Sequence, residues 1–490
     1  MTLRTRKALL FTLSSAALAA TLTAPAHARS AAPAAPTLDW KACAGSPGAE
    51  CAGLSVPLDY REPGGRHLTV AVSRLRTDRP QARRGTLLLI PGGPGGSGRE
   101  KLRSRGEAVR KATGGAYDIV SFDPRGVGGS SLADCGLEKD DLELTHLQPW
   151  PGPGGDIRAN ADRSRRIAET CTRNGGEVLR SLSTANEVRD IDMLRQALGE
   201  KKLSAWASSY GTYVGAVYAQ KYPQHTDRWV LDSSGDPDPS RVARGWLANM
   251  AGAADDVFPD FAAWAADPAR EAGQRVAERP EDVRPLFLAL AEKLDGVPEE
   301  AGGKQQLTGN RLRMMMQSAL YSRTAYPRLA EMIVAARRAG DTPVAVEPAR
   351  ISSTEAAVYV GVICNDVRWP RSLPDYTRAV AGDRAKHPLT AGMPVNVTPC
   401  AFWPDEPADK PTRITADGPS NVLMVQNLRD PATPYRGALK MREALGDRAR
   451  MVAVDAGGHG AYLGGNACGD GAVNDFLTTG RRPAHDTLCR

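Results

Sequence analysis

Short apolar runs separated by longer amphipathic segments set the hydrophobic pattern of this chain. Four of the five residues from Thr86 to Ile90 are Leu or Ile, which is typical of a strand buried on both faces of a parallel sheet. Tyr117 to Phe122 is predicted to be the next buried strand. In His67 to Leu75 apolar and polar residues alternate, which predicts a strand with one buried face. Further strands are predicted at residues 54–58, 203–207, 229–231, 421–426 and 450–454.

A capped helix is predicted between two of these strands, over residues 183–199. Ser183 or Thr184 can serve as its N-cap, an apolar stripe recurs at helical spacing, and Gly199 ends it. Strands that alternate with helices in this way predict an α/β fold with a mostly parallel sheet.

The pattern changes at about residue 236, where strand-like runs give way to amphipathic segments rich in Ala, Arg and Glu. Val283 to Leu294 and Asn310 to Arg323 are predicted helices, and the second carries three consecutive methionines, which suit apolar packing or the wall of an apolar pocket. We therefore expect a core at residues 39–235, a helical cap inserted at 236–415, and a second part of the core at 416–490.

The first 28 residues have the pattern of a secretory signal peptide. Arg4, Arg6 and Lys7 precede an apolar run, and Ala26 to Ala28 offers a small-residue cleavage site. Residues 29–38 are expected to be a flexible leader. The net charge of +7 falls to +4 without the three signal cations, and charges of both signs are interspersed. The pattern favours a secreted protein and argues against nucleic acid and a membrane anchor as partners.

Eight cysteines, an even number, suggest four disulfides in an exported chain. Eight cysteines allow 105 pairings, and we predict that neighbours along the chain pair. No cysteine or histidine cluster has the spacing of a zinc site, so no metal is expected. The predicted pairs are Cys43 with Cys51, Cys135 with Cys171, Cys364 with Cys400, and Cys468 with Cys489.

Residues 203–218, LSAWASSYGTYVGAVY, combine a strand, a sharp turn and a helix. This is the context of a nucleophile elbow, whose pattern is small-x-Ser-x-Gly. Ala207 and Gly211 stand two residues before and after Ser209, so the register makes Ser209 the nucleophile and Ser208 the variable position.

A glycine-rich loop, PGGPGGSG, follows the predicted strand at 86–90. It lacks the lysine and the spacing of nucleotide-binding loops and suits half of an oxyanion hole. Pro94 has no N–H, so Gly93 is the expected donor, and the N–H of Tyr210 is the expected second donor.

Two further side chains complete the pattern of a serine hydrolase. Asp430 follows the strand at 421–426 in a turn fixed by two prolines. His459 lies in a Gly-flanked loop after the strand at 450–454. The chain order Ser209, Asp430, His459 is the order of the catalytic triad in α/β-hydrolases.

The segments ASSYGTYVGAVYAQKYP, LIPGGPGGSG, VSFDPRGVGGSS, LRDPATPYRGA and GGHGAYL resemble those of the secreted bacterial tripeptidyl aminopeptidases. These are serine exopeptidases of the α/β-hydrolase fold, related to proline iminopeptidases. The resemblance implies that Ser209, Asp430 and His459 form the triad, with Gly93 and Tyr210 as oxyanion donors, peptides as substrates and no cofactor. Two residues depart from the family pattern: Ala207 replaces a Gly, and Pro91 stands where proline iminopeptidases have His.

An exopeptidase must also bind the free amino group of its substrate, and a carboxylate on the cap suits this task. Asp366 is the preferred candidate, because a disulfide at Cys364 would hold it rigidly, and Glu355 and Asp236 are alternatives. We expect a monomer. A secreted esterase or lipase, a peptide-tailoring or small-molecule hydrolase, and a non-catalytic binding protein remain open on the same scaffold.

Overall fold

The computed structural model describes residues 36–240 and 242–490. The predicted signal peptide, residues 1–28, and most of the expected leader lie outside the described residues.

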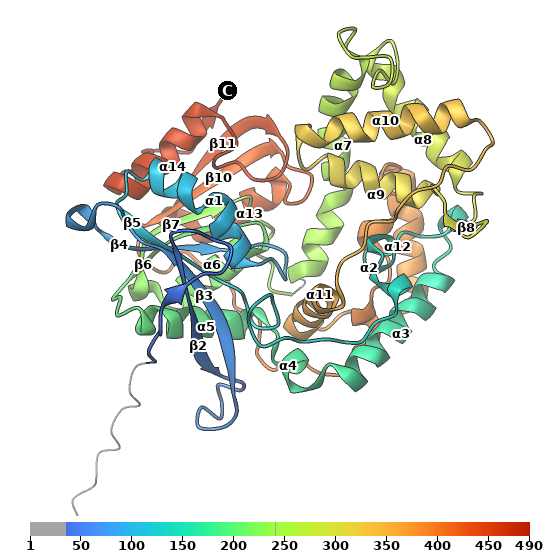
Figure 1. The fold of residues 1–490 in the computed structure, drawn as a ribbon. Coiled ribbons are helices and arrows are strands. Elements are labelled where there is room, and N and C mark those ends of the chain that lie inside the picture. The colour runs from blue at the N-terminus through green and yellow to red at the C-terminus, as the bar shows by residue number, and fades with distance from the viewer. Residues whose placement is uncertain (1–35, 241) are drawn as a thin grey trace, which may run out of the picture. The chain divides into compact units, whose positions relative to one another are not determined.

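Ten strands form one sheet in the order β1-β2-β3-β5-β4-β6-β7-β10-β11-β12 (Figure 1). The first three strands are joined antiparallel to one another and to β5, and every other pairing is parallel. The strands are β1 (Lys41–Ala42), β2 (Ala49–Pro57), β3 (His67–Leu75), β4 (Gly85–Ile90), β5 (Tyr117–Phe122), β6 (Leu203–Ser208), β7 (Thr226–Asp232), β10 (Val422–Arg429), β11 (Ala449–Gly457) and β12 (Thr487–Cys489).

Helices cover both faces of this sheet, which explains why the four residues from Leu87 to Ile90 of β4 are all apolar. Leu87 and Leu89 pack into the cluster that includes side chains of α1 and α14. Leu88 and Ile90 pack on the other face, among side chains of α5, α6 and α13. The prediction of an α/β-hydrolase fold is confirmed. The flanking helices are α1 (Gly98–Ala112), α5 (Thr184–Ala197), α6 (Tyr210–Lys221), α13 (Tyr435–Leu445) and α14 (Ala467–Thr479).

Residues 236–415 are mainly helical, and four of their helices share a hydrophobic cluster of their own. Phe258, Phe261 and Phe287 lie in this cluster with Leu312 and Tyr326. One short hairpin, β8 (Glu300–Ala301) with β9 (Lys304–Gln305), interrupts the helices. The predicted helix at 310–323 ends earlier, at residue 319. The helices are α7 (Val242–Ala266), α8 (Pro280–Leu294), α9 (Gly309–Ala319), α10 (Tyr326–Ala339), α11 (Ser353–Asp366) and α12 (Leu373–Lys386).

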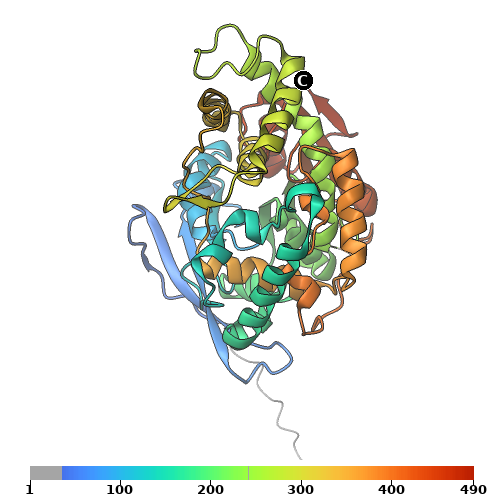
Figure 2. The same cartoon turned by 90° about the vertical axis from the view of Figure 1, so that its right-hand side faces the viewer.

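The helices of residues 236–415 also pack against a segment that we assigned to the core from the sequence. Between β5 and α5 lie α2 (Leu144–Leu147), α3 (Arg158–Asn174) and α4 (Gly176–Ser181). Here α2 packs against α9, α3 packs on the 3-10 turn at residues 399–402, and α4 packs against α11. Figure 2 shows the teal helices of this segment among the helices of the cap.

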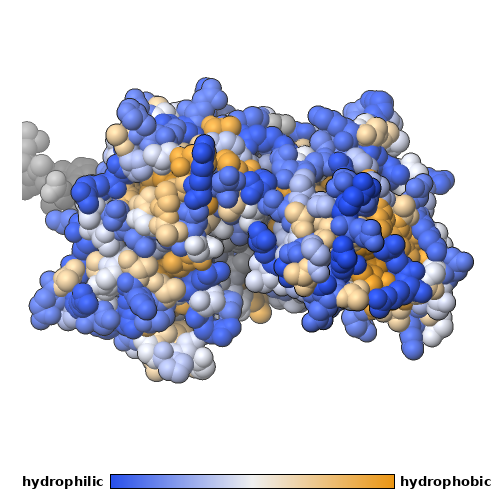
Figure 3. Space-filling model, turned by 90° about the horizontal axis from the view of Figure 1, so that it is seen from above, coloured by the Kyte–Doolittle hydropathy of each residue, from blue (hydrophilic) through white to orange (hydrophobic). Residues whose placement is uncertain are grey.

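Four disulfides are present, and they are the four pairs of neighbouring cysteines. The surface seen in Figure 3 is largely hydrophilic, with hydrophobic side chains showing in separate patches. Across the described ranges, no helix has both the length and the apolar character needed to cross a membrane.

Candidate active site

Ser209 lies at the sharp turn between β6 and α6, in a backbone conformation that L-residues rarely adopt. Its φ is +57° and its ψ is −129°. Such strain persists only where the surroundings enforce it, and it is a mark of the nucleophile elbow. A side chain at Gly211 would place its Cβ 2.4 Å from the carbonyl oxygen of Pro91, so only glycine fits there.

Asp430 follows the last residue of β10 and is 1% exposed. Its Oδ1 accepts hydrogen bonds from the backbone N–H groups of Ala432, at 2.9 Å, and Thr433, at 2.8 Å. The Thr433 hydroxyl donates to Oδ2 at 3.1 Å. These donors stabilise the charged carboxylate and fix its orientation in the turn.

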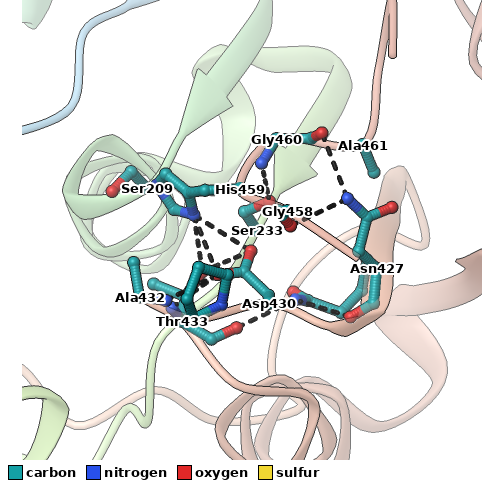
Figure 4. Close-up of polar contacts among 12 residues, drawn as sticks. Ser209, Ser233, Asn427, Asp430, Ala432, Thr433, Gly458, His459, Gly460 and Ala461 are labelled. Carbon is teal, nitrogen blue, oxygen red and sulfur yellow. Dashed lines mark hydrogen bonds and ion pairs between the residues drawn. The ribbon is translucent and has the colours of Figure 1, made fainter. Parts of the chain in front are cut away.

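His459 Nδ1 lies 3.0 Å from both carboxylate oxygens of Asp430. In Figure 4 the imidazole ring lies between Ser209 and Asp430. The ring of Tyr321 packs edge-on against it, with centroids 5.2 Å apart. The structure therefore brings together the three side chains that the sequence singled out from segments 29 to 250 residues apart.

Opposing effects act on the pKa of His459. Burial alone would lower it, but the charge of Asp430 and the hydrogen bond to it outweigh burial, so the pKa is raised above the usual value. A raised pKa makes the imidazole a stronger base toward a serine hydroxyl.

The glycine-rich loop runs directly beside the serine. A Cβ added at Gly92 would lie 3.0 Å from the Cβ of Ser209. Gly93 has a φ of +117°, a conformation open to glycine, and no backbone hydrogen bond of its N–H occurs within the described residues. Tyr210 is the first residue of α6, so its N–H has no partner in the helix. Both N–H groups are thus available for a negatively charged oxygen.

Two cavities meet at Ser209. The first, here the α1-side cavity, measures about 590 Å³ and includes Lys101, Ser208 and His459 in its lining. The second, here the cap-side cavity, measures about 100 Å³. Its lining includes Tyr210 and six cap residues, Trp246, Leu247, Met250, Tyr321, Tyr359 and Ile363. Ser209 and Gly93 line both cavities, so a substrate that spans them would pass over the serine and the glycine-rich loop.

Asp366 lies at the end of α11 and is held by the first residue of α5. Its Oδ1 accepts the Thr184 N–H at 2.8 Å and its Oδ2 accepts the Thr184 hydroxyl at 2.5 Å. Burial raises the pKa of Asp366 to about 6, against the lowering effect of these hydrogen bonds. The carboxylate lines a small cavity of about 20 Å³.

The network continues from Thr184 to the tyrosine that follows the serine. The Thr184 hydroxyl lies 2.9 Å from the Tyr210 hydroxyl, which donates to Glu187 at 3.2 Å. Burial raises the pKa of Glu187 to about 8, so it carries a proton at neutral pH. Asp366 is therefore connected to the oxyanion side of the site, although it lines neither cavity at Ser209.

The other two acids considered for the amine are placed differently. Glu355 is exposed at the N-terminus of α11, where it forms a capping box with Ser352. Asp236 is buried and forms an ion pair of 2.7 Å with Lys440. Neither lines the cavities at Ser209.

Sequence patterns missed Asp232, which holds the histidine loop. Its carboxylate accepts the N–H groups of Ala461, at 2.8 Å, and Tyr462, at 3.3 Å, and the Trp206 indole N–H at 3.1 Å. Burial raises its pKa. Its position at the end of a buried strand was the available signal. In residues 36–240 and 242–490, no group of three or more His, Cys, Asp or Glu is placed to hold a metal ion.

The fold, the strained Ser209 and the histidine–aspartate contact define a serine hydrolase with the α/β-hydrolase fold. Known proteins agree with this class. The chain is 35% identical to a tripeptidyl aminopeptidase of Streptomyces lividans, over 92% of this chain and 86% of that protein. It therefore belongs to the tripeptidyl aminopeptidase family.

The chain also matches one family model and two further relatives. The family model described as TAP-like protein matches residues 388–489. The serine protease Hip1 of Mycobacterium tuberculosis is 27% identical, over 90% of this chain and 87% of its own. A carboxylesterase B of the same species is 29% identical, over 90% of this chain and 86% of its own.

Proposed function

We propose that this protein is an exported serine exopeptidase that releases tripeptides from the free N-terminus of peptides or proteins. The observation that carries the proposal is the contact of His459 with Asp430 beside the strained Ser209, in a chain of the tripeptidyl aminopeptidase family. The apolar N-terminal pattern and four disulfides support export, since disulfides persist in oxidising compartments.

Acylation begins with the attack of Ser209 on the substrate and the formation of a tetrahedral intermediate. Ser209 Oγ attacks the carbonyl carbon of the scissile bond, and its proton moves to His459 Nε2. The carbonyl electron pair moves onto the oxygen, which the N–H groups of Gly93 and Tyr210 stabilise, each contributing on the order of 10²–10³-fold in rate. Asp430 keeps the proton on Nδ1 and stabilises the imidazolium.

Acylation is complete when the carbon–nitrogen bond breaks and the departing amine receives the proton from His459. Deacylation uses the same groups. Water then attacks the acyl-enzyme while His459 takes one of its protons, and the proton returns to Ser209 as the bond to the serine breaks.

The position of Asp366 supports tripeptide release. Tyr359 and Ile363 line the cap-side cavity, and Asp366 follows them on the same face of α11, at helical spacing. Asp366 lies seven residues after Tyr359, about 10.5 Å along the helix axis from this wall of the cap-side cavity. Three extended residues span about 10 Å. A cavity of about 20 Å³ beside Asp366 accommodates one water-sized group, which is the size of an ammonium.

A matched pair of tripeptide anilides, one free and one acetylated at its amine, tests the exopeptidase proposal. Loss of one partner of a desolvated charge pair costs about 2–5 kcal/mol, so acetylation should lower kcat/KM by about 30-fold or more. In Asp366→Asn the ratio of kcat/KM on the free anilide to kcat/KM on the acetylated anilide should fall toward one. In Glu355→Gln and Asp236→Asn this ratio should stay as high as in the unmodified enzyme. Equal rates on both anilides in the unmodified enzyme would refute amine recognition and leave a serine hydrolase.

The second candidate function is ester hydrolysis, which the relative named carboxylesterase B favours. An esterase needs the same acyl-enzyme chemistry but no amine anchor. Comparing p-nitrophenyl acyl esters with free-amine tripeptide anilides separates the two. Efficient hydrolysis of simple esters together with inert anilides would replace the peptidase proposal by this one.

A further inference from the structure

The α1-side cavity has features that the acyl transfer does not use. His459 lines this cavity and not the cap-side cavity. The departing amine takes its proton from His459, so the part of the substrate that leaves must lie on the His459 side. If the proposed function holds, on which this inference rests, the α1-side cavity receives the residue after the scissile bond.

Lys101 of α1 lies in the wall of this cavity, next to Ser208, the residue before the nucleophile. Its Nζ donates to Ser208 Oγ at 2.6 Å and to the carbonyl oxygen of Ile90 at 2.8 Å. The ammonium also lies 4.4 Å from the centroid of the Trp206 ring. An ammonium has three N–H donors, so one donor and the positive charge remain for a ligand.

Two further donors line the same wall. Ser208 accepts the hydrogen bond from Lys101, which leaves its own O–H to donate. Arg105 lies one helical turn after Lys101 and also lines the cavity. Guanidinium groups bind carboxylates in a fork geometry.

The acidic side chains of the cavity are engaged elsewhere. Glu100 forms two hydrogen bonds with Arg103, at 2.8 and 2.6 Å. The Asp232 carboxylate accepts hydrogen bonds from Trp206 and from the histidine loop, and it acts on Lys101 through its charge rather than by taking one of its N–H donors. The groups left to meet a ligand are therefore cations and hydroxyls.

We propose that Lys101, Ser208 and Arg105 form a subsite for the free α-carboxylate of the residue that follows the scissile bond. In the leaving residue, the carboxyl carbon is two bonds from the scissile nitrogen. The Lys101–Ser208 pair is equally near the nucleophile, since the Cα atoms of Ser208 and Ser209 are about 3.8 Å apart. The subsite is therefore at the right distance for the carboxylate of a leaving group of one residue. The preferred substrates are then peptides one residue longer than the released unit, and the second product is a free amino acid.

Tetra-alanine and tetra-alanine amide form the matched substrate pair, with tri-alanine measured by mass spectrometry. The assay runs at pH 6, because burial lowers the pKa of Lys101 to about 7 and the ammonium is charged below it. The other ionisable groups that line this cavity are Glu100, Arg105, Asp232, Tyr321, His459 and Tyr462. Charge-assisted hydrogen bonds predict a kcat/KM at least tenfold higher for the acid than for the amide.

The variants separate recognition from support of the fold, because a general loss of activity cancels in the acid-to-amide ratio. The ratio should fall to about one in Lys101→Met and several-fold in Arg105→Gln. It should be unchanged in the matched control Lys111→Met, because Lys111 is an exposed residue of the same helix that does not line the cavity. If Lys101→Met does not fold, the acid-to-amide ratios of the unmodified enzyme and of Arg105→Gln still test the subsite.

Each outcome has a distinct meaning. A ratio near one in the unmodified enzyme, or a ratio that Lys101→Met retains, would overturn the carboxylate subsite and leave the peptidase proposal intact. Release of tri-alanine from neither peptide would overturn the proposed function and the subsite with it.

Discussion

Replacement of Asp430 by Asn is the sharpest test of the triad, because it changes one atom and keeps the shape. The two backbone N–H groups of Ala432 and Thr433 both point at Oδ1. The amide oxygen of Asn must stay there, since an NH₂ group cannot accept them. The NH₂ then takes the place of Oδ2, facing the imidazole of His459.

This geometry sets the expected magnitude. An NH₂ that donates to Nδ1 favours the imidazole tautomer with its proton on Nε2, which cannot accept the proton of Ser209. In a serine protease the equivalent change costs about 10⁴-fold in kcat. Here Oδ1 also lies 3.0 Å from Nδ1 and can retain part of the original contact. We therefore expect a loss of about 10³–10⁴-fold, or about 4–5.5 kcal/mol of transition-state stabilisation.

The assay compares kcat on a tripeptide anilide with thermal unfolding of the same samples. Asp455→Asn is the matched control, since Asp455 lies on β11 near the histidine loop and pairs with Arg429 in an exposed position. It should keep near-normal kcat. A loss below tenfold in a folded Asp430→Asn protein would contradict the role assigned to Asp430.

Two other predictions concern pH and stability. Burial raises the pKa of Asp366 to about 6, so its charge is present above that pH and is lost as pH falls through it. The free-to-acetylated ratio on anilides should therefore be high at pH 7 and fall toward pH 5, and a flat profile would exclude Asp366 as the anchor. Replacing Cys468 and Cys489 by Ser removes a link across 21 residues between α14 and β12. The free energy of unfolding in urea should fall by about 3 kcal/mol with kcat unchanged, and an unchanged urea midpoint would contradict this.

The hydrophobic pattern predicted the central strands well, because a strand covered on both faces is mainly apolar. Thr86 to Ile90 and Tyr117 to Phe122 needed no information from distant residues. The elbow was equally local, since a tight turn requires small residues at fixed distances from the serine. The contact of Asp430 with His459 followed from strand order, since parallel strands bring their ends to one edge.

Contacts between distant segments left no such signal. Lys101 and Ser208 are 107 residues apart, and Asp232 and Ala461 are 229 apart. Nothing in the amphipathic pattern of α3 indicates whether its apolar face packs on the sheet or on the cap. For the same reason the expected core range included helices that pack against the cap.

The two departures from the family pattern show how neighbouring residues absorb a local change. Ala207 adds a methyl group where glycine is usual, between β6 and α6. A Cβ at Gly215 would lie 3.1 Å from this methyl group, so glycine at 215 provides the space that alanine at 207 takes up. The carbonyl oxygen of Pro91 lies against Gly211, where the start of the glycine-rich loop contacts the elbow. Larger residues at 211 or 215 would push α6 away from the sheet, and the N–H of Tyr210 would move with it.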